Sequence, residues 1–208
     1  SDLIETAFAL CKQRNFPVMA HATNPESVKM AIKLGAHTVE HAYITDEDCI
    51  TEFVSSGTWY VPTLSISQLS PNLATTEHEK AYAASKQLAP DLVVRADAAA
   101  ADHRSSFQKA LSAGVKMALG SDISPMKDSA LLELGLWVKC GATTWQALSA
   151  ATKNAAEMCG VGLELGTVEA GKLADLIVVT DNPLSDIENL RKLELVLKEG
   201  QIVADHRS

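Results

Sequence analysis

The sequence predicts an α/β protein built around a parallel sheet, followed by a small β unit. Helical and extended patterns alternate with a period of about 20 residues through most of the chain, which is typical of βα units in a parallel sheet. The short apolar segments end in histidine or aspartate rather than in a glycine-rich loop. From residue 163 the pattern changes to short β-type segments around turns. We therefore expect an α/β unit over 1–162 and a β unit over 163–208.

Apolar spacing and turn residues set the expected bounds of each element. Asn24, which precedes Pro25, and Thr45 are the expected helix caps. The first unit is predicted to contain, in order, a helix over 3–15, a strand over 18–21, a helix over 26–34, a strand over 38–41, a helix over 45–56, a strand over 59–64, helices over 77–88 and 90–113, a strand over 115–120, and helices over 131–140 and 144–159. The second is predicted to contain a strand over 176–179 and a hairpin over 195–203 that turns at Glu199-Gly200.

Composition and charge exclude several classes of protein. A net charge of −8 argues against a nucleic-acid partner, which requires a basic face. No apolar run approaches the ~20 residues that cross a membrane, and the acidic first residues do not resemble a signal peptide. The four cysteines form no CxxC pair, so we expect buried or half-buried free thiols in the cytoplasm and no cysteine-ligated zinc.

Three predicted strands end in residues that can bind a metal ion. His21 and His41 end two successive short strands, and Asp122 follows the strand over 115–120. Chemistry in parallel α/β folds gathers at the carboxyl ends of the strands, and one βα unit separates the two histidines, so they should lie on adjacent strands. Two imidazoles and a carboxylate suit a catalytic zinc ion that keeps a position open for water.

The alternative for a single histidine is a satisfied polar residue after a buried strand, but two at the same relative position, together with Asp122, favour a metal site. Alternation along the strands places Ala20 and Glu40 on the face opposite to His21 and His41. Around this site, Tyr43 is a candidate substrate contact, with loop packing as its alternative. The remaining residues considered are Ser65 and Ser67 as weaker substrate contacts, Ser124, Pro125 and Met126 as lining of the mouth, and His103 as a surface or capping residue of a helix.

Two architectures contain parallel strands joined by helices. A flavodoxin-like nucleotide binder is disfavoured because the sequence contains neither GxGxxG nor GxxxxGK[ST]. A (β/α)₈ barrel needs eight strands, usually over about 250 residues. This chain has enough strands for half of such a barrel.

Five segments carry a resemblance to a known family. They are Val18-Met19-Ala20-His21-Ala22, Thr38-Val39-Glu40-His41-Ala42, the segment from Gly114 to Asp122, the segment from Ala147 to Glu157, and the segment from Gly166 to Leu176. Together they resemble the metal-dependent amidohydrolase superfamily, in its imidazolonepropionase and prolidase-like branch. The last two segments are the most specific, and the matches run nearly from end to end.

The resemblance implies a fold and a set of residue roles. It implies strands five to eight of a (β/α)₈ barrel over 1–162 and the C-terminal part of a small β-sandwich over 163–208. His21 and His41 would bind metal at the ends of strands five and six. Asp122 would end strand eight as a ligand and as the general base of the reaction. A divalent ion, with zinc expected and one or two ions in the complete protein, would activate the water that hydrolyses an amide, peptide or cyclic amide.

The sequence departs from the family in its ligand set. The His-x-His pair of the family's first strand and the lysine of its fourth strand have no counterpart here. The chain therefore resembles the C-terminal half of an amidohydrolase, which by itself is expected to be inactive. It is expected to form a homo-oligomer or to associate with the missing N-terminal half, because open sheet edges pair with other chains. The expected substrate is a small molecule or dipeptide-like compound; the competing hypothesis is a catalytically inactive fragment that serves as an interaction or assembly module.

Overall fold

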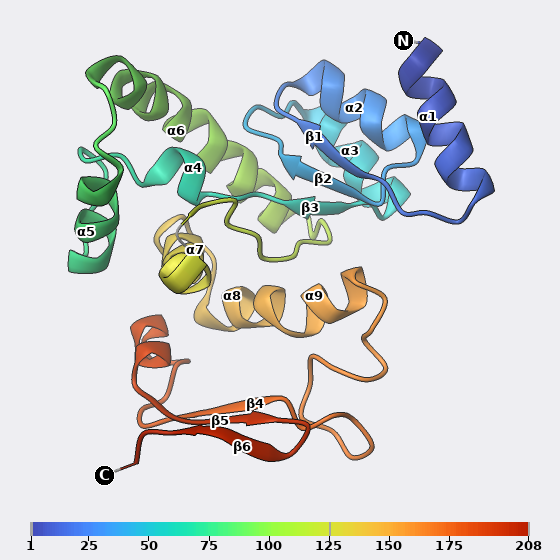
Figure 1. Ribbon diagram of the computed structural model, residues 1–208. Helices are drawn as coiled ribbons and strands as arrows, with labels where there is room; N and C mark the ends of the chain where they lie inside the picture. The colour runs from blue at the N-terminus through green and yellow to red at the C-terminus, as the bar shows by residue number, and fades with distance from the viewer. Residues whose placement is uncertain (1, 125, 208) are drawn as a thin grey trace.

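A three-stranded parallel sheet lies at the centre of the first part of the chain (Figure 1), in a computed structural model that describes residues 2–124 and 126–207. Its strands are β1 (Met19–Ala22), β2 (Thr38–His41) and β3 (Trp59–Val61), in that order across the sheet. Both pairs are parallel, with Ala20 beside Val39 and Val39 beside Tyr60. All three carboxyl ends therefore open at one edge of the sheet, as expected for successive βα units.

One group of helices covers one side of the sheet. A second group lies between this sheet and a second sheet (Figure 1). The helices of the first part are α1 (Asp2–Gln13), α2 (Pro25–Leu34), α3 (Glu47–Ser56), α4 (Ser65–Gln68), α5 (Glu77–Lys86) and α6 (Pro90–Ser112). A middle layer contains the short helix η1 (Met126–Asp128), α7 (Ser129–Lys139), α8 (Thr144–Ala151) and α9 (Lys153–Met158). The second sheet follows, with β4 (Leu176–Val179), η2 (Ile187–Arg191), β5 (Leu193–Lys198) and β6 (Gln201–Asp205).

The two faces of the parallel sheet differ in what they bury. The helix-facing side holds the main core, where Val39, Tyr60, Phe53 and Phe107 are at most 1% exposed. The other face carries a small cluster of Trp59, Val61 and Ala118, with Met158 packed against it. Because apolar burial contributes about 25 cal/mol per Å², the helix side supplies most of the stabilisation. The other face is left to contribute to the site.

The residue that caps α2 is the predicted one, whereas the residue that caps α3 is not. Asn24 caps α2 in a capping box with Ser27, as predicted, and Gly35 ends the helix with a φ of 89°. Asp46, not Thr45, caps α3 by accepting a hydrogen bond from the amide of Cys49. Thr45 is buried instead, and its amide donates to Ser106 on α6.

Several predicted elements are shorter or interrupted. The strand expected over 115–120 is reduced to one bridge between Tyr60 and Met117, because the amide of Leu119 donates to the Ala150 carbonyl of α8 instead of to a strand. The strand expected over 59–64 ends at 61, before Pro62, which has no amide hydrogen to donate. Thr152 divides the helix expected over 144–159 into α8 and α9. Helix α4 was not predicted.

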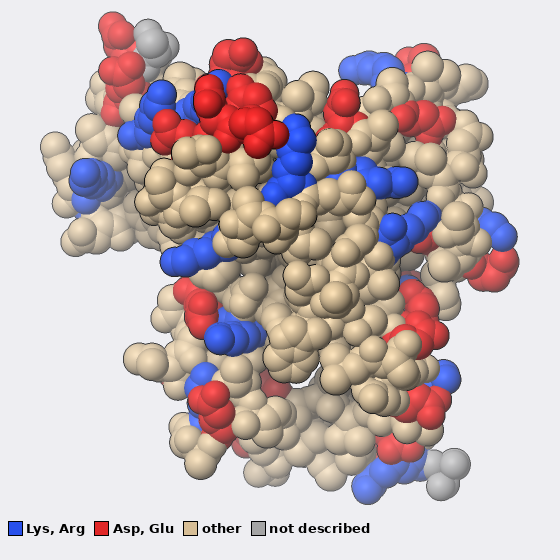
Figure 2. Space-filling view, turned by 180° about the vertical axis from the view of Figure 1, so that it is seen from behind, with Lys and Arg blue, Asp and Glu red and all other residues tan. Residues whose placement is uncertain are grey.

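The C-terminal sheet is antiparallel, in the order β4-β5-β6. The predicted hairpin is confirmed, and its turn residues Glu199 and Gly200 have φ values of 51° and 78°, which suits the right-handed twist of the flanking strands. An apolar groove of about 810 Å³ lies between α8–α9 and β4, with Trp145, Leu148 and Val168 in its lining. Figure 2 shows the surface hollowed between the upper part of the molecule and this sheet, and shows acidic and basic side chains interspersed on the same face.

Two further sequence expectations concern the membrane and the cysteines. Within 2–124 and 126–207, no helix is both long and apolar enough to cross a membrane. The four cysteines are free thiols as expected, with Cys49 and Cys140 buried. Cys159 is exposed, contrary to expectation, because it follows the end of α9.

Candidate active site

The structure brings His21 and His41 together at the carboxyl edge of the parallel sheet. They lie on the adjacent strands β1 and β2, and their ring centroids are 4.5 Å apart with the planes inclined by 66°. His21 is exposed and His41 is 6% exposed. The pair therefore joins a buried imidazole to one that solvent can reach.

The side chain of His41 reaches this edge through a local change of backbone conformation and not through the predicted alternation along the strand. The register pairs His21 with Glu40, so these two side chains share a face and Glu40 does not point away from the site as predicted. Alternation alone would leave His41 on the helix-facing side with Val39. His41 instead adopts a φ of 72°, and Ala42 a φ of 41°. This left-handed backbone takes the imidazole out of the strand's alternation and against His21.

A buried threonine fixes the orientation of the His41 ring. His41 Nδ1 lies 2.7 Å from Thr63 Oγ1, and the Thr63 hydroxyl donates its one hydrogen to the carbonyl of Pro62 at 2.7 Å. The ring must therefore donate from Nδ1, which leaves the lone pair on Nε2. Burial lowers the pKa of His41 and the neighbouring His21 lowers it further, against the opposing charge of Asp122. A neutral imidazole with a free Nε2 lone pair is the form that binds a metal ion.

Asp122 lies in the loop after the bridge at Met117 and is exposed, with a φ of 49°. Its charge reaches the residues of the strand ends: burial raises the pKa of Glu40 and of Tyr43, and Asp122 raises both further. Sequence reasoning did not include Glu40 in the site, although this carboxyl group directly precedes His41 in the chain.

Strained backbone gathers at these strand ends. His41, Ala42, Thr63 and Asp122 all have positive φ values without being glycine. Such conformations cost about 1–3 kcal/mol each and persist where the surrounding structure enforces them, which is commonly at functional sites. The edge that holds the two imidazoles is therefore also the strained edge of the sheet.

Tyr43 packs between two histidines. Its ring centroid is 5.4 Å from that of His41 and 4.8 Å from that of His103. His103 is 0% exposed, so the prediction of a surface or capping residue is wrong: α6 turns this side chain inward, and Ser67 Oγ lies 2.7 Å from its Nδ1. Burial lowers the pKa of His103 to about 4. Ser67, a predicted substrate contact, is buried against His103 instead.

Glu133 is a second buried polar residue that sequence reasoning missed. Its carboxylate, 0% exposed, accepts hydrogen bonds from the amides of Leu64 and Ser65 at 2.8 Å each and from Trp137 Nε1 at 3.1 Å, and it contacts the Ser65 hydroxyl. Burial raises its pKa to about 7. Glu133 thus holds the turn that follows Thr63. The signal in the sequence was one charged residue inside the apolar run of α7.

The side chains present fit part of a metal site. The two imidazoles have the right chemistry, and the Thr63 contact of His41 is the kind of hydrogen bond that orients metal-binding histidines. Among the residues that the structure describes, however, no three His, Cys, Asp or Glu side chains are grouped so that they could hold an ion. Asp122 is therefore close enough to act by charge but does not complete the set with the histidines.

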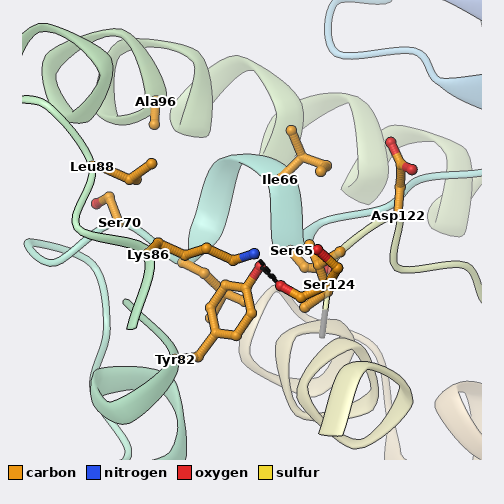
Figure 3. Close-up of a pocket in the computed structure, with 11 residues that line it drawn as sticks. Ser65, Ile66, Ser70, Tyr82, Lys86, Leu88, Ala96, Asp122 and Ser124 are labelled. Atoms are coloured by element: carbon orange, nitrogen blue, oxygen red, sulfur yellow. Dashed lines mark hydrogen bonds between the residues drawn. The ribbon is translucent and has the colours of Figure 1, made fainter. Parts of the chain in front are cut away.

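A cavity of about 270 Å³ lies on one side of Asp122 (Figure 3). Its walls come from α4, the end of α5, α6 and the loop after Asp122, and the residues that line it are Ser65, Ile66, Leu69, Ser70, Tyr82, Lys86, Leu88, Ala96, Asp122, Ile123 and Ser124. Ser124 lies at the mouth as expected, and Ser65, although buried, contributes to the wall. Met126 is 82% exposed and is not part of the lining. Pro125 lies outside the described residues.

Fold and site together define an α/β protein in which paired imidazoles and a nearby carboxylate meet at the carboxyl edge of a parallel sheet. Comparison with known proteins gives the family. The model of the amidohydrolase family matches residues 1–203, and the chain belongs to this family, with an α/β amidohydrolase-like fold.

Individual relatives agree with this assignment. The chain is 33% identical over 178 residues to an ochratoxinase of Aspergillus niger, covering 85% of the chain and 35% of that protein. It is 30% identical over 205 residues to an imidazolonepropionase of Agrobacterium fabrum, covering 95% of the chain and 40% of that protein. The crystal structure of a Xaa-Pro dipeptidase with bound methionine in its active site matches with a TM-score of 0.81 at 30% identity, covering 96% of the chain and 47% of that structure. The chain thus spans less than half the length of these relatives.

Proposed function

We propose that this chain is part of a metal-dependent hydrolase of C–N bonds, in amides, peptides or cyclic amides. The observation that carries the proposal is the contact of two imidazoles at the carboxyl edge of the sheet, with Nδ1 of His41 held by Thr63 and its Nε2 lone pair free. His21 and His41 would hold the ion, zinc being the expected one. Asp122, which does not form a three-donor group with them in this structure, would supply the third donor of this chain in the assembled site. Further donors, and the second ion where two are bound, belong to the rest of the site.

The finer architecture is part of the same proposal. Strands β1, β2 and β3 correspond to strands five to seven of a (β/α)₈ barrel, and the bridge at Met117 marks the eighth. Residues 1–162 form this part of the barrel, and 163–208 form the C-terminal part of a small β-sandwich. The exposed inner face at Met19, 74% exposed on the edge strand β1, supports an arrangement in which other strands complete the sheet. Those strands come from another segment or from a second copy of the chain.

The residues of the chain have separate roles in the reaction. A bound divalent ion supplies Lewis acidity, which polarises a carbonyl and lowers the pKa of water. Asp122, exposed and near enough to His41 for its charge to act on that imidazole, would take the proton of the attacking water and return it to the leaving amine. Tyr43 lies against His41 and contacts the substrate from the loop after β2. Thr63 and Tyr60 hold the ring and the carbonyl of His41 in place.

The names of the relatives support the substrate class that we propose. They are an imidazolonepropionase, an ochratoxinase and a Xaa-Pro dipeptidase. A small-molecule or dipeptide-like substrate fits all three. The absence of a nucleic-acid or membrane partner and the cytoplasmic location stay predictions.

Metal analysis tests the proposal. The longest natural form of the protein that contains these residues should hold zinc after dialysis, and changing both His21 and His41 to Asn should lower its affinity about 100-fold or more. The matched control is His37→Asn, because His37 lies at the amino end of β2 and contacts the Met158 carbonyl instead. Asp122→Asn should reduce amide hydrolysis by about 10²–10⁴-fold. Full zinc binding by the double variant would contradict the proposal.

The competing function is an inactive assembly module. It is favoured by the lack of a three-donor group among the described residues and by the apolar groove beside β4. This function requires that the natural protein bind no zinc at micromolar concentration and hydrolyse no amide. Stoichiometric zinc that depends on His21 and His41 would exclude it.

A further inference from the structure

The segment from Gly120 to Asp122, which ends in the proposed proton acceptor, is attached to the rest of the protein on two sides. Gly120 lies so close to β3 that a Cβ on it would be 2.5 Å from Val61 Cγ1. The carbonyl of Ser121 lies 3.0 Å from the Oγ of Ser65, the first residue of α4. Figure 3 shows Ser65 beside the loop that carries Asp122. Because Asp122 is exposed, with a φ of 49°, the position of its carboxylate depends on how firmly these neighbours hold the backbone.

The Ser65 hydroxyl has one hydrogen but lies against two acceptors. One is the Ser121 carbonyl, and the other is Oε2 of Glu133 on α7. The remaining contacts of the carboxyl group are with N–H donors: Leu64 and Trp137 donate to Oε1, and the Ser65 amide donates to Oε2. Because one hydrogen makes only one of the two contacts, the other needs a hydrogen from Glu133. Both contacts are hydrogen bonds when Glu133 is protonated, since Oε2–H then donates to Ser65 Oγ, and Ser65 Oγ–H donates to the Ser121 carbonyl.

The surroundings of Glu133 favour this neutral form. Its side chain is 0% exposed, and an unpaired charge is costly in such a place. Tyr60 on β3 and Cys140 at the end of α7 are titratable groups that face it. Burial raises the pKa of both, and the charge of Glu133 raises each further, so these two groups stay uncharged and neutralise nothing. Burial likewise raises the pKa of Glu133 itself to about 7.

Two cations, Arg104 on α6 and Lys139 at the end of α7, lie in the same region and are bonded elsewhere. Arg104 donates to Gln68 Oε1 at 2.8 Å, and Lys139 donates to Glu79 Oε2 at 2.9 Å. Within 2–124 and 126–207, neither these nor any other basic side chain lies within salt-bridge distance of the Glu133 carboxyl group. A proton, and not an ion pair, therefore keeps this group stable in the core.

We propose that Glu133 and Ser65 are positioning residues for Asp122: the protonated carboxyl of Glu133, acting through the Ser65 hydroxyl and the Ser121 carbonyl, fixes the segment from Gly120 to Asp122 in place. These three groups form the Glu133–Ser65–Ser121 network. The inference rests on the proposed function only for what Asp122 does once it is placed, as third donor and proton acceptor. Glu133 is buried and acts only through Ser65.

The network makes the position of Asp122 dependent on pH. When Glu133 loses its proton to solvent, Oε2 accepts the Ser65 hydrogen, and the Ser121 carbonyl is left without that donor. Since the pKa of Glu133 is about 7, the loop is held in place below this pH and loosened above it. Ser65 transmits the change, so removal of its hydroxyl should also remove the pH dependence.

Hydrogen exchange of backbone amides tests the network without metal or substrate. The longest natural form of the protein is measured by mass spectrometry at about pH 6 and about pH 8, with each rate divided by the intrinsic rate at that pH. In the segment 118–124, the amides of Ala118 and Leu119 are protected by hydrogen bonds to Tyr60 and Ala150. We expect this segment to exchange about fivefold faster at the higher pH, the effect of one lost hydrogen bond. Helix α2 is the internal reference for opening of the whole protein.

Three variants assign the effect to the Ser65 hydroxyl and the Glu133 proton. Ser65→Ala should exchange the segment at the faster rate at both pH values, and Ser65→Thr should behave as the unaltered protein does. Glu133→Gln cannot ionise and should show no difference between the two pH values. The matched control is Thr58→Val, because Thr58 is also buried and donates to the Ala36 carbonyl at 3.1 Å, at the amino end of the same sheet. This control should leave exchange in the segment unchanged.

Hydrolysis separates this inference from the proposed function. In an active protein, Ser65→Ala should lower kcat for amide hydrolysis about tenfold or more and change KM by less than about twofold, since a misplaced catalytic group acts on the transition state. Unchanged exchange in Ser65→Ala, an equal effect of Thr58→Val, or exchange in the unaltered protein that does not depend on pH would each overturn the network. So would an unchanged kcat in an active Ser65→Ala protein. A protein that hydrolyses no amide but shows the Ser65-dependent exchange would contradict the proposed function and leave the network intact.

Discussion

The carboxyl edge of the parallel sheet and the C-terminal sheet differ in which side chains they bury. The edge buries polar side chains, and the C-terminal sheet exposes apolar ones. At the edge, His41, Thr63 and Glu133 are polar and at most 6% exposed. In the C-terminal sheet, Ile202 on β6 is apolar and 54% exposed, and Val203 beside it is 61% exposed. The edge orders polar groups inside the protein, whereas the sheet leaves apolar groups in water on both of its faces.

This difference separates a region that orders buried polar groups from a region that leaves apolar surface uncovered. A buried polar group is stable only when it has partners, and His41, Thr63 and Glu133 each have at least one. An exposed apolar side chain in a sheet costs little where it stands and gains stability only when another surface covers it. Substitutions should therefore have large effects at the edge and small ones in the C-terminal sheet of the chain alone.

The largest effect is expected at Glu133. Glu133→Ala leaves the amides of Leu64 and Ser65 and the indole of Trp137 without their acceptor, inside a buried space. We expect the free energy of unfolding to fall by about 3–5 kcal/mol, measured by urea unfolding. Glu157→Ala is the control, because Glu157 is exposed on α9 and should change stability by at most about 0.5 kcal/mol. Equal losses in the two variants would remove the contrast between edge and surface.

The pH dependence of stability should identify the same residue. Since burial raises the pKa of Glu133 from its ordinary 4.5 to about 7, the folded state holds this proton over a range in which the unfolded state has lost it. The contribution of Glu133 to stability is therefore present below about pH 4.5 and lost as the pH rises to about 7, by up to about 3 kcal/mol. Glu133→Gln should lack this loss. The measurement compares unfolding free energies of the two proteins at pH 5 and pH 7.5, and parallel profiles would show that Glu133 does not titrate in that range.

Thr63 should affect metal binding more than stability. Thr63→Val keeps the shape of the side chain and removes the hydroxyl that faces His41 Nδ1. We expect zinc affinity to fall about 10–100-fold, as for other hydrogen bonds that orient a ligand, and the free energy of unfolding to fall by about 1 kcal/mol. Thr63→Ser retains the hydroxyl and should restore affinity. An unchanged zinc affinity in the valine variant would show that His41 needs no support from Thr63.

Sequence reasoning predicted the order of the parallel strands and the positions of the two histidines, because apolar runs and their last residues are local signals. It misplaced Glu40 and did not foresee the turn of His41, because a left-handed φ at a non-glycine residue has no local signature. Alternation is a rule for extended backbone, and it stops applying where the strand ends.

Tertiary packing explains the other differences. The apolar residues over 115–120 predict a strand, but the second neighbour of this segment is helix α8 and not a strand. The charged and alanine residues of α6 predict a surface position for His103, yet this side chain lies on the inward face of the helix and packs against Tyr43. Contacts between residues far apart in the chain decide both cases, Leu119 with Ala150 in the first and Tyr43 with His103 in the second, and a single sequence does not display them.

The smallest effect of substitution on the free energy of unfolding is expected in the C-terminal sheet. Thr has a high strand propensity, so Ile202→Thr and Val203→Thr should each change the unfolding free energy of this chain by at most about 0.5 kcal/mol. Val196→Thr on the central strand β5, where the side chain is half-buried, is the matched comparison and should cost more. If the β6 variants instead lose more than about 1 kcal/mol in the longest natural form, these side chains are covered there. The same substitutions, made in the two forms of the protein, therefore distinguish a bare sheet from one that another surface completes.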